Sequence, residues 1–180
     1  ILVCNQKGGV GKTTTAINLS ACLAEKGKRV LTIDMDSQGN TTSGLGIDKS
    51  TVEHTSYQLL TNETTIWEAM TPSIVPGLSV IASERSLAGA EIELIGVEDR
   101  EFILKKEVDK VRDNYDFVII DCPPSLNTLT VNAMTTADTV LVPIQCEYYA
   151  LEGLSELIYT IELVKERLNN KLEIEGVVFT

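Results

Sequence analysis

Short apolar runs alternate with longer amphipathic segments along this chain. The runs are rich in β-branched residues and predict strands at 1–5, 29–34, 78–82, 116–121, 139–144 and 174–180. Several runs are continuously apolar, which is typical of parallel strands that are covered on both faces. Segments with apolar positions three and four residues apart predict helices at 13–26 and 150–168. Gly27 follows the first of these, where a left-handed residue commonly ends a helix.

Strands that alternate with helices of this length predict βαβ crossovers and a parallel sheet. We therefore expect an α/β fold with a mostly parallel twisted sheet and helices on both faces. The stretch 38–76 is rich in Thr, Ser and Gly and is the least regular part. No linker or repeat divides the chain, so residues 1–180 predict a single domain. Because the sequence opens without methionine and stops in strand-like sequence, we expect this domain to be truncated at both termini.

Composition and charge narrow the class of protein. The apolar fraction is 43% and the charged fraction 23%, a globular balance, and no apolar run is long enough for a membrane-spanning helix. A net charge of −11 opposes nucleic-acid binding unless a local basic patch exists. One basic cluster is interleaved with acidic residues at helical spacing, which predicts a solvated, salt-bridged face. It consists of Lys105, Lys106, Lys110 and Arg112.

The cysteines do not predict a disulfide framework or a zinc site, because they are far apart and form no CxxC pair. They are Cys4, Cys22, Cys122 and Cys146. We interpret them as reduced thiols that pack as small hydrophobic side chains.

A glycine-rich segment directly follows the first predicted strand. It reads Asn5-Gln6-Lys7-Gly8-Gly9-Val10-Gly11-Lys12-Thr13-Thr14. Glycines let the backbone curl so that consecutive N–H groups point at phosphate oxygens, and the following helix adds its positive dipole end. Lys12 can reach the β- and γ-phosphates of a nucleotide, and the Thr13 hydroxyl can ligate Mg²⁺. Residues 7–14 are therefore predicted to bind phosphate, within a P-loop NTPase-like fold.

This loop departs from the generic pattern, which has a glycine five residues before Gly11, where this chain has Gln6. It has instead a second lysine, Lys7, at its mouth. Two cations crowded at one phosphate loop are unfavourable within a single subunit. The arrangement is explained if Lys7 points outward to the nucleotide of a facing subunit, as an arginine finger acts in trans. The alternative is a solvated lysine on the rim of the loop.

Carboxylates that could hold a metal or orient water lie at the ends of predicted strands. Asp121 ends one strand, in the usual setting of a Walker-B acid, which holds magnesium through water. Asp34 and Asp36 follow another strand. Open α/β sheets bind their ligands at these carboxyl ends. Aspartates at strand ends also commonly cap turns, so the phosphate loop is what favours a functional interpretation.

Four segments together resemble the ParA/Soj chromosome- and plasmid-partition ATPases, which belong to the wider ParA/MinD group with a deviant Walker A motif. The segments are the loop 7–14, Asp34-Met35-Asp36-Ser37-Gln38-Gly39-Asn40, Asp121-Cys122-Pro123-Pro124-Ser125 and Gln145-Cys146-Glu147-Tyr148-Tyr149-Ala150-Leu151-Glu152-Gly153. The resemblance covers essentially the whole chain. The second and fourth segments are much more specific to the partition branch than the first.

The resemblance implies a role for individual residues. Lys7 matches the signature lysine that reaches the partner's nucleotide across a dimer interface. Lys12 matches the Walker-A lysine, and Thr13 matches the magnesium ligand. Asp36 matches the acid of the first switch region that positions the attacking water, and Asp121 matches the Walker-B acid. The segments around 39–40 and 123–125 match regions that respond to the γ-phosphate, whereas Tyr148 and Tyr149 could contact a partner or flank the nucleotide.

The resemblance also implies a cycle with ATP and Mg²⁺ as cofactors. ATP binding drives formation of a homodimer, the dimer binds DNA non-specifically, and a ParB-type activator stimulates hydrolysis and release. Such a protein is cytoplasmic and associates with the nucleoid in its ATP-bound state. Family members continue well beyond residue 180, and that later part carries adenine contacts and most of the basic DNA-contacting surface.

Three other functions use the same loop. A MinD-like membrane-cycling ATPase would need an amphipathic C-terminal helix that this chain could not show. A redox ATPase like the nitrogenase iron protein would need paired cysteines at a cluster site. A metabolic enzyme such as dethiobiotin synthetase would phosphorylate a small carboxylate, but it would leave the 145–153 stretch unexplained.

Overall fold

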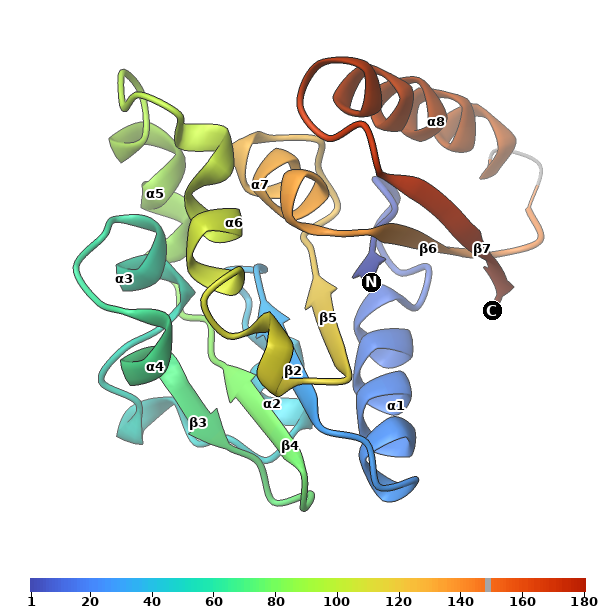
Figure 1. The fold of residues 1–180 in the computed structure, drawn as a ribbon. Coiled ribbons are helices and arrows are strands. Elements are labelled where there is room, and N and C mark those ends of the chain that lie inside the picture. The colour runs from blue at the N-terminus through green and yellow to red at the C-terminus, as the bar shows by residue number, and fades with distance from the viewer. Residues whose placement is uncertain (148–149) are drawn as a thin grey trace.

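A seven-stranded sheet forms the centre of the computed structural model (Figure 1). The structure describes all residues except 148–149, and for residues 150–152 it describes the backbone alone. The strand order is β3-β4-β2-β5-β1-β6-β7. The strands are β1 Leu2–Val3, β2 Val30–Asp34, β3 Met70–Pro72, β4 Leu78–Ile81, β5 Phe117–Asp121, β6 Thr139–Ile144 and β7 Glu173–Phe179. All pairings are parallel except that of β3 with β4. The predicted mostly parallel sheet is confirmed.

The sequence pattern predicts six of these strands but not β3. This strand pairs antiparallel with β4 at the edge of the sheet, with Met70 opposite Ile81 and Pro72 opposite Ser79. Proline cannot donate to a strand ladder and is tolerated mainly at such edges. Three residues that end in proline carry too little periodicity to be recognised as a strand.

Eight α-helices are recognised in the described chain. They are α1 Lys12–Glu25, α2 Asn40–Gly44, α3 Ser56–Leu60, α4 Ile66–Ala69, α5 Leu87–Glu93, α6 Ile103–Val108, α7 Thr128–Thr136 and α8 Ala150–Arg167. The helices predicted at 13–26 and 150–168 correspond to α1 and α8. Gly27, with φ of 77°, donates to Ala24 O, while Lys28 donates to Leu23 O, so α1 ends in a Schellman motif. The irregular stretch 38–76 holds α2, α3, α4 and β3, all of five residues or fewer.

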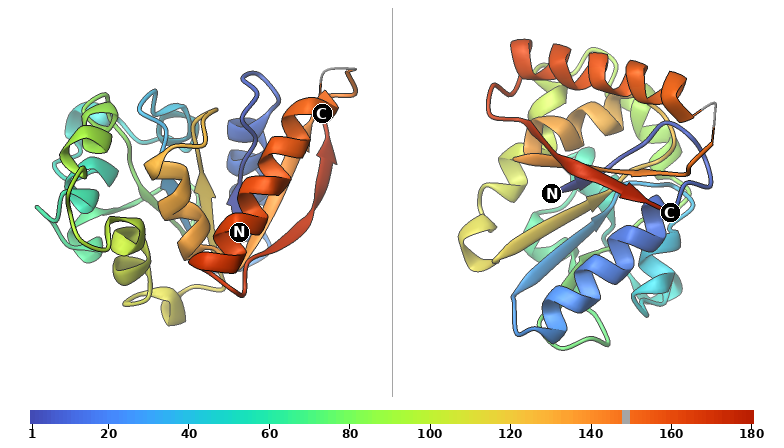
Figure 2. Two further views of the ribbon diagram at one scale, coloured as in Figure 1. Left: turned by 90° about the horizontal axis from the view of Figure 1, so that it is seen from above. Right: turned by 90° about the vertical axis from the view of Figure 1, so that its right-hand side faces the viewer.

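Helices cover both faces of the sheet, as predicted. Successive residues of β1 and β2 alternate between two apolar clusters. Leu2 and Leu31 join the cluster under α3–α8, whereas Val3 and Val30 join the cluster under α1. In the right-hand view of Figure 2, α8 lies above the strands and α1 below them. Because neighbouring residues of a strand point to opposite faces, two covered faces require the continuous apolar runs seen in the sequence.

The strand register brings the candidate residues together at the carboxyl ends of the strands. Asp34 at the end of β2 lies directly opposite Asp121 at the end of β5, and Val3 of β1 is also in register with Asp121. The loop after β1 leaves the sheet between β5 and β6. Open parallel sheets bind ligands in the crevice at the carboxyl ends of strands where the connections diverge. We therefore expect a ligand-binding site at these strand ends.

The predicted basic cluster is a salt-bridged surface. Lys105 pairs with Asp109 at 3.2 Å, and Lys106 pairs with Asp99 at 3.2 Å. Arg112 pairs with Asp138 at 3.3 Å. Because these cations are already neutralised by neighbouring carboxylates, the cluster offers little free positive charge to a polyanion.

The four cysteines are free thiols, and they divide by burial. Cys4 and Cys122 are buried in the larger apolar cluster, and burial raises the pKa of Cys4 to about 12. The interpretation as packed hydrophobic side chains therefore holds for these two. Cys22 and Cys146 are exposed, so the interpretation is wrong for them.

Among the described residues, no helix is both long and apolar enough to cross a membrane.

Candidate functional site

The loop between β1 and α1 has the curled backbone that a phosphate site needs. Gly9 and Gly11 have φ values of 74° and 81°, in the left-handed region that glycine adopts without strain. Gly11 is also the N-cap of α1, and a Cβ built there would lie 3.2 Å from the Thr180 side chain. The backbone conformation therefore favours glycine, and there is little room for a side chain beside Thr180.

Lys12 lies in the first turn of α1 and is largely buried beneath this loop. Its Nζ donates to the Lys7 carbonyl oxygen at 2.9 Å, so the ammonium group folds back over the curled backbone. Burial lowers the pKa of Lys12, and the negative charge of Asp121 partly offsets that effect. A cation held in this position is ready to contact a phosphate seated on the loop.

A cavity of 330 Å³ opens at the N-terminus of α1. It is lined by Gly8, Gly9, Gly11, Lys12, Thr13, Thr14, Asp36, Asn40 and Pro124. Backbone N–H groups and the positive end of the helix dipole make such a place favourable for an anion. Six of the predicted phosphate-binding residues and Asp36 thus share one cavity, whereas Lys7 and Val10 line a neighbouring one.

Asp121 lies fully buried beside this cavity, and its two carboxylate oxygens differ in their contacts. Its Oδ2 accepts from the Thr13 hydroxyl at 2.9 Å and from the Thr41 hydroxyl at 2.6 Å. Its Oδ1 is buried without a hydrogen-bond partner among the described residues. Burial raises the pKa of Asp121, and the two hydroxyl donors counteract that rise. A buried, unsatisfied carboxylate oxygen beside a threonine hydroxyl fits a hard cation or its bound water.

The two aspartates after β2 occupy different environments. Asp36 lines the cavity, and its Oδ1 accepts from the Gln38 backbone N–H at 2.9 Å. Asp34 is fully buried, and its Oδ2 accepts from the Thr42 backbone N–H at 2.8 Å and hydroxyl at 2.7 Å. Of these two aspartates, Asp36 is therefore the one whose position allows contact with a ligand in the cavity. Asp34 fastens the start of α2 to the end of β2.

Burial raises the pKa of Asp34 from its ordinary 3.8 to about 7. The folded protein then holds this proton more tightly than the unfolded chain does. The free energy of unfolding contributed by this group therefore falls as pH rises from 3.8 to about 7, and levels off above. The neighbouring carboxyl of Asp121 has a raised pKa and contributes with the same sign.

We expect Asp34→Asn to flatten this pH dependence when thermal melting is followed from pH 5 to 8 in the presence of EDTA. The variant loses the Asp36 N–H contact to Oδ1, so its absolute stability also falls, and the slope is the quantity to compare. Asp113→Asn, at an exposed aspartate, serves as the matched control. An unchanged slope in Asp34→Asn would show that Asp34 does not titrate in this range.

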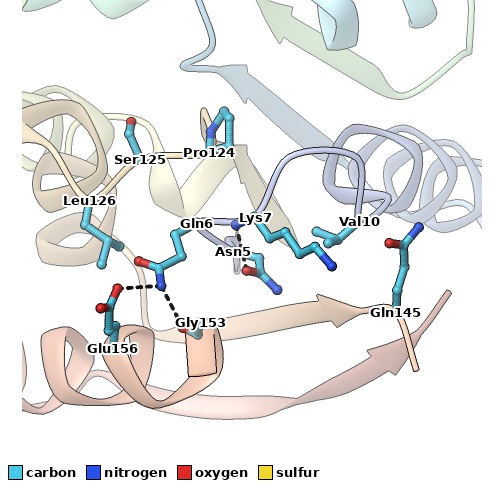
Figure 3. A pocket seen from close by; sticks show the side chains of 10 residues that line it. All are labelled: Asn5, Gln6, Lys7, Val10, Pro124, Ser125, Leu126, Gln145, Gly153 and Glu156. Carbon is cyan, nitrogen blue, oxygen red and sulfur yellow. Dashed lines mark hydrogen bonds between the residues drawn. The ribbon is translucent and has the colours of Figure 1, made fainter. Parts of the chain in front are cut away.

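Lys7 does not line the phosphate cavity but an adjoining one of 510 Å³, which is drawn in Figure 3. Its side chain extends toward Gln145, and its Nζ forms an ion pair with Glu147. The predicted crowding of two cations at one loop is thus avoided within the subunit, because Lys12 turns inward and Lys7 turns outward. The ion pair links residues 140 positions apart, and sequence reasoning gave no sign of it.

Gln6, which stands where the generic loop has a glycine, fastens the loop to α8. Its Nε2 donates to the Gly153 carbonyl oxygen at 3.1 Å and to Glu156 at 2.7 Å (Figure 3). A Cβ at Gly153 would lie 3.3 Å from that nitrogen, so a small residue is favoured there. These contacts connect the 145–153 stretch with the loop, although Tyr148 and Tyr149 themselves lie outside the described residues.

Sequence reasoning also missed Thr41 and Thr42, whose hydroxyls bind Asp121 and Asp34. The signal that could have found them is their position. They follow the 34–40 segment directly, at the start of a short helix, where hydroxyl side chains commonly bond to neighbouring polar groups.

A parallel sheet with a curled glycine loop leading into a helix, a buried lysine and a strand-end aspartate defines a P-loop nucleotide-binding protein. Residues 1–174 match the family described as AAA domain. The chain is 54% identical over 180 residues to the sporulation initiation inhibitor protein Soj of Bacillus subtilis, covering all of this chain and 71% of that protein. It is 52% identical to the chromosome partitioning protein ParA of Myxococcus xanthus, again over the whole chain but only 64% of that protein. The chain belongs to this family of Soj/ParA partition proteins, which confirms the resemblance.

Solved structures agree with this assignment of the fold. Cobyrinic acid a,c-diamide synthase from Mycobacterium smegmatis, crystallised with an ATP analog and magnesium, superposes with a TM-score of 0.94. It is 39% identical, and the match covers 99% of this chain and 72% of that one. A plasmid partition protein from Borrelia burgdorferi gives a TM-score of 0.85 at 29% identity, covering 98% of this chain and 78% of that one.

Proposed function

We propose that this chain is the ATP- and Mg²⁺-binding part of an ATPase switch for chromosome or plasmid segregation. The observation that carries the proposal is the 330 Å³ cavity at the N-terminus of α1. Lys12, Thr13 and Asp36 line it, and Asp121 is buried beside it. The relatives named Soj and ParA support the partition role. The M. smegmatis structure with an ATP analog and magnesium supports the choice of ligands.

The residues around the cavity would divide the work of nucleotide binding and hydrolysis. Loop N–H groups and the Lys12 ammonium would hold the phosphates. Thr13 would ligate magnesium directly, and the free Oδ1 of Asp121 would hold it through a water molecule. Magnesium, when bound, neutralises charge on the phosphate oxygens. Asp36 would orient the attacking water and accept its proton, which it can do because it lines the cavity.

Lys7 would act on the nucleotide of a second copy of the chain. It does not line the cavity that holds Lys12, and its only charged partner among the described residues is Glu147 on a half-exposed surface. A phosphate group of a facing subunit carries more negative charge than a carboxylate and would replace Glu147. Dimerisation would then depend on ATP, because without a phosphate to accept it Lys7 stays paired with Glu147 of its own chain and makes no contact across the interface.

The remaining partners would bind mainly outside this chain, which spans about two thirds of its relatives' length. The net charge is −11, and the basic cluster around α6 is internally paired. Non-specific DNA contact would therefore come mostly from the part beyond residue 180. We propose that a ParB-type partner activates hydrolysis and that the protein is cytoplasmic and associates with the nucleoid. Both proposals are based on the similarity to Soj and ParA.

Lys7→Gln in the full-length protein is expected to bind nucleotide as a monomer almost normally but to lose the ATP-dependent dimer. Light scattering with and without a slowly hydrolysed ATP analogue distinguishes the monomer from the dimer. Two controls bracket the result. Glu147→Gln removes the partner of Lys7 in the same chain and should still dimerise, and Lys26→Gln changes an exposed lysine at the far end of α1. Normal dimer affinity in Lys7→Gln would make Lys7 a residue of the loop rim only.

A metabolic function is the second candidate, favoured by the similarity to the cobyrinic acid a,c-diamide synthase of M. smegmatis. In that case the 510 Å³ cavity beside Lys7 would hold an anionic small substrate. Identity to the partition proteins is higher, at 52–54% against 39%, so we rank this second. ATP turnover assayed with small carboxylates, in parallel with DNA and a ParB-type partner, separates the two functions.

A further inference from the structure

Two neighbouring threonines at the start of α2 bind the two strand-end carboxylates. Thr41 donates to Asp121 at 2.6 Å, and Thr42 donates to Asp34 at 2.7 Å. Both threonines are fully buried. The contacts span 80 and 8 residues of sequence, and they fix α2 against the ends of β5 and β2. Neither threonine lines the proposed nucleotide cavity, so neither is accounted for by direct contact with a ligand.

The Thr41 contact determines how the Asp121 carboxylate is turned. Thr13 and Thr41 both donate to Oδ2, which leaves Oδ1 as the oxygen without a hydrogen-bond partner in the part of the chain that the structure describes. Thr13 lies on the phosphate side in α1, whereas Thr41 approaches from α2. A carboxylate held by one donor can rotate about its last bond, but two donors on the same oxygen restrict it to one orientation. Thr41 therefore keeps Oδ1 available for a cation or its water.

The same contact joins Asp121 to the segment that carries Asp36. The Gly39 N–H donates to the Asp36 carbonyl oxygen at 2.8 Å, and this tight turn leads directly into α2. Gly39 has φ of 61°, and a Cβ there would lie 2.9 Å from the Ser83 carbonyl oxygen, so the turn is closely packed. A shift of Asp121 would thus move Thr41 and, through this short turn, Asp36.

We propose that Thr41 is a positioning residue for the divalent cation, which orients Asp121 and links the occupancy of the cation site to the placement of Asp36. The inference rests on the proposed function, because it assumes that the cation binds at Thr13 and Asp121. Thr41 touches neither the nucleotide nor the metal in this account. Its hydroxyl acts only through the Asp121 carboxylate.

Mn²⁺ binding in the presence of ADP tests the proposal without relying on hydrolysis. Electron paramagnetic resonance of free Mn²⁺ gives the affinity directly, and Mn²⁺ accepts the same oxygen ligands as Mg²⁺. We expect Thr41→Val to weaken Mn²⁺ binding by about 10- to 100-fold, the usual effect of removing a group that orients a metal-binding side chain. Thr41→Ser keeps the hydroxyl and is expected to restore most of the affinity. ADP affinity in EDTA is expected to be unchanged in both variants.

Hydrogen exchange at residues 40–44 provides a second readout. In the wild-type protein, Mg²⁺ added with ADP is expected to slow exchange in α2, because the cation and Thr41 share Asp121. Thr41→Val is expected to lose this response. If Thr41→Val does not fold, as judged by its melting, Thr41→Ala removes the same hydroxyl without placing a methyl group against the carboxylate.

Thr136→Val is the matched control, because Thr136 is a largely buried threonine whose hydroxyl donates to the Asn132 carbonyl oxygen in α7, away from the site. Equal losses of Mn²⁺ affinity in Thr136→Val and Thr41→Val would reduce Thr41 to a structural role. Wild-type Mn²⁺ affinity in a folded Thr41→Val would overturn the positioning role and leave the proposed function intact. Failure of the wild-type protein to bind Mn²⁺ with ADP would instead refute the nucleotide site itself.

Discussion

Lys12→Ala is expected to reduce nucleotide affinity more than any other single change in the loop. Lys12 is the cation that lines the phosphate cavity, and it is largely buried. Removing one partner of a buried, hydrogen-bonded charge pair costs about 2–5 kcal/mol, which corresponds to a loss of roughly 30-fold to several thousand-fold in affinity. Titration with a fluorescent ATP analogue in the presence of Mg²⁺ measures the loss.

Folding should be little affected by this change, which makes the result interpretable. The only hydrogen bond recorded for the Lys12 ammonium within the described chain is to the Lys7 carbonyl oxygen, and burial already lowers its pKa. Lys12 therefore contributes little to the stability of the empty protein, and its melting temperature should stay near that of the wild type. Lys105→Ala, in the salt-bridged surface around α6, is the control for loss of one positive charge. Wild-type nucleotide affinity in Lys12→Ala would place the phosphates elsewhere.

Asp36→Ala is expected to slow ATP hydrolysis by at least about 100-fold while leaving nucleotide affinity nearly unchanged. A group that orients water and accepts its proton contributes typically 10²- to 10⁴-fold, and it acts mainly as charge develops in the transition state. Binding of the ground state does not require it. Single-turnover hydrolysis by the full-length protein, with ATP-dependent dimerisation measured in parallel, separates the two effects.

Asp36→Asn is the informative companion to this variant. Its side-chain oxygen can still accept the Gln38 N–H, so the turn that carries residue 36 keeps its geometry while the negative charge is lost. Slow hydrolysis in both variants would assign the effect to the carboxylate. Slow hydrolysis in Asp36→Ala alone would assign it to the shape of the turn. Wild-type rates in both would exclude Asp36 from the hydrolytic step.

The main strands and the phosphate loop could be predicted because their signals are local. A parallel strand covered on both faces needs a continuous apolar run, and a left-handed loop position needs glycine, so β1, β2 and Gly11 are visible in the residues themselves. The short elements between 38 and 76 could not be predicted in the same way. Each has five residues or fewer, and their stability comes from packing against α1, α5, α6 and the sheet rather than from periodicity.

The amino-acid sequence by itself determined which residue types reach the candidate site, because the loop and the strand-end aspartates are encoded by their own neighbours. Only the tertiary structure decided how those side chains are used. It buried Asp34 and exposed Asp36 to the cavity, paired Lys7 with Glu147, and placed Thr41 on Asp121. The physical reason is that the two kinds of feature depend on residues at different separations along the sequence. Backbone conformation follows from adjacent residues, whereas the pairing of hydroxyls, carboxylates and ammonium groups depends on the register of β2 against β5 and on segments 80 to 140 residues apart.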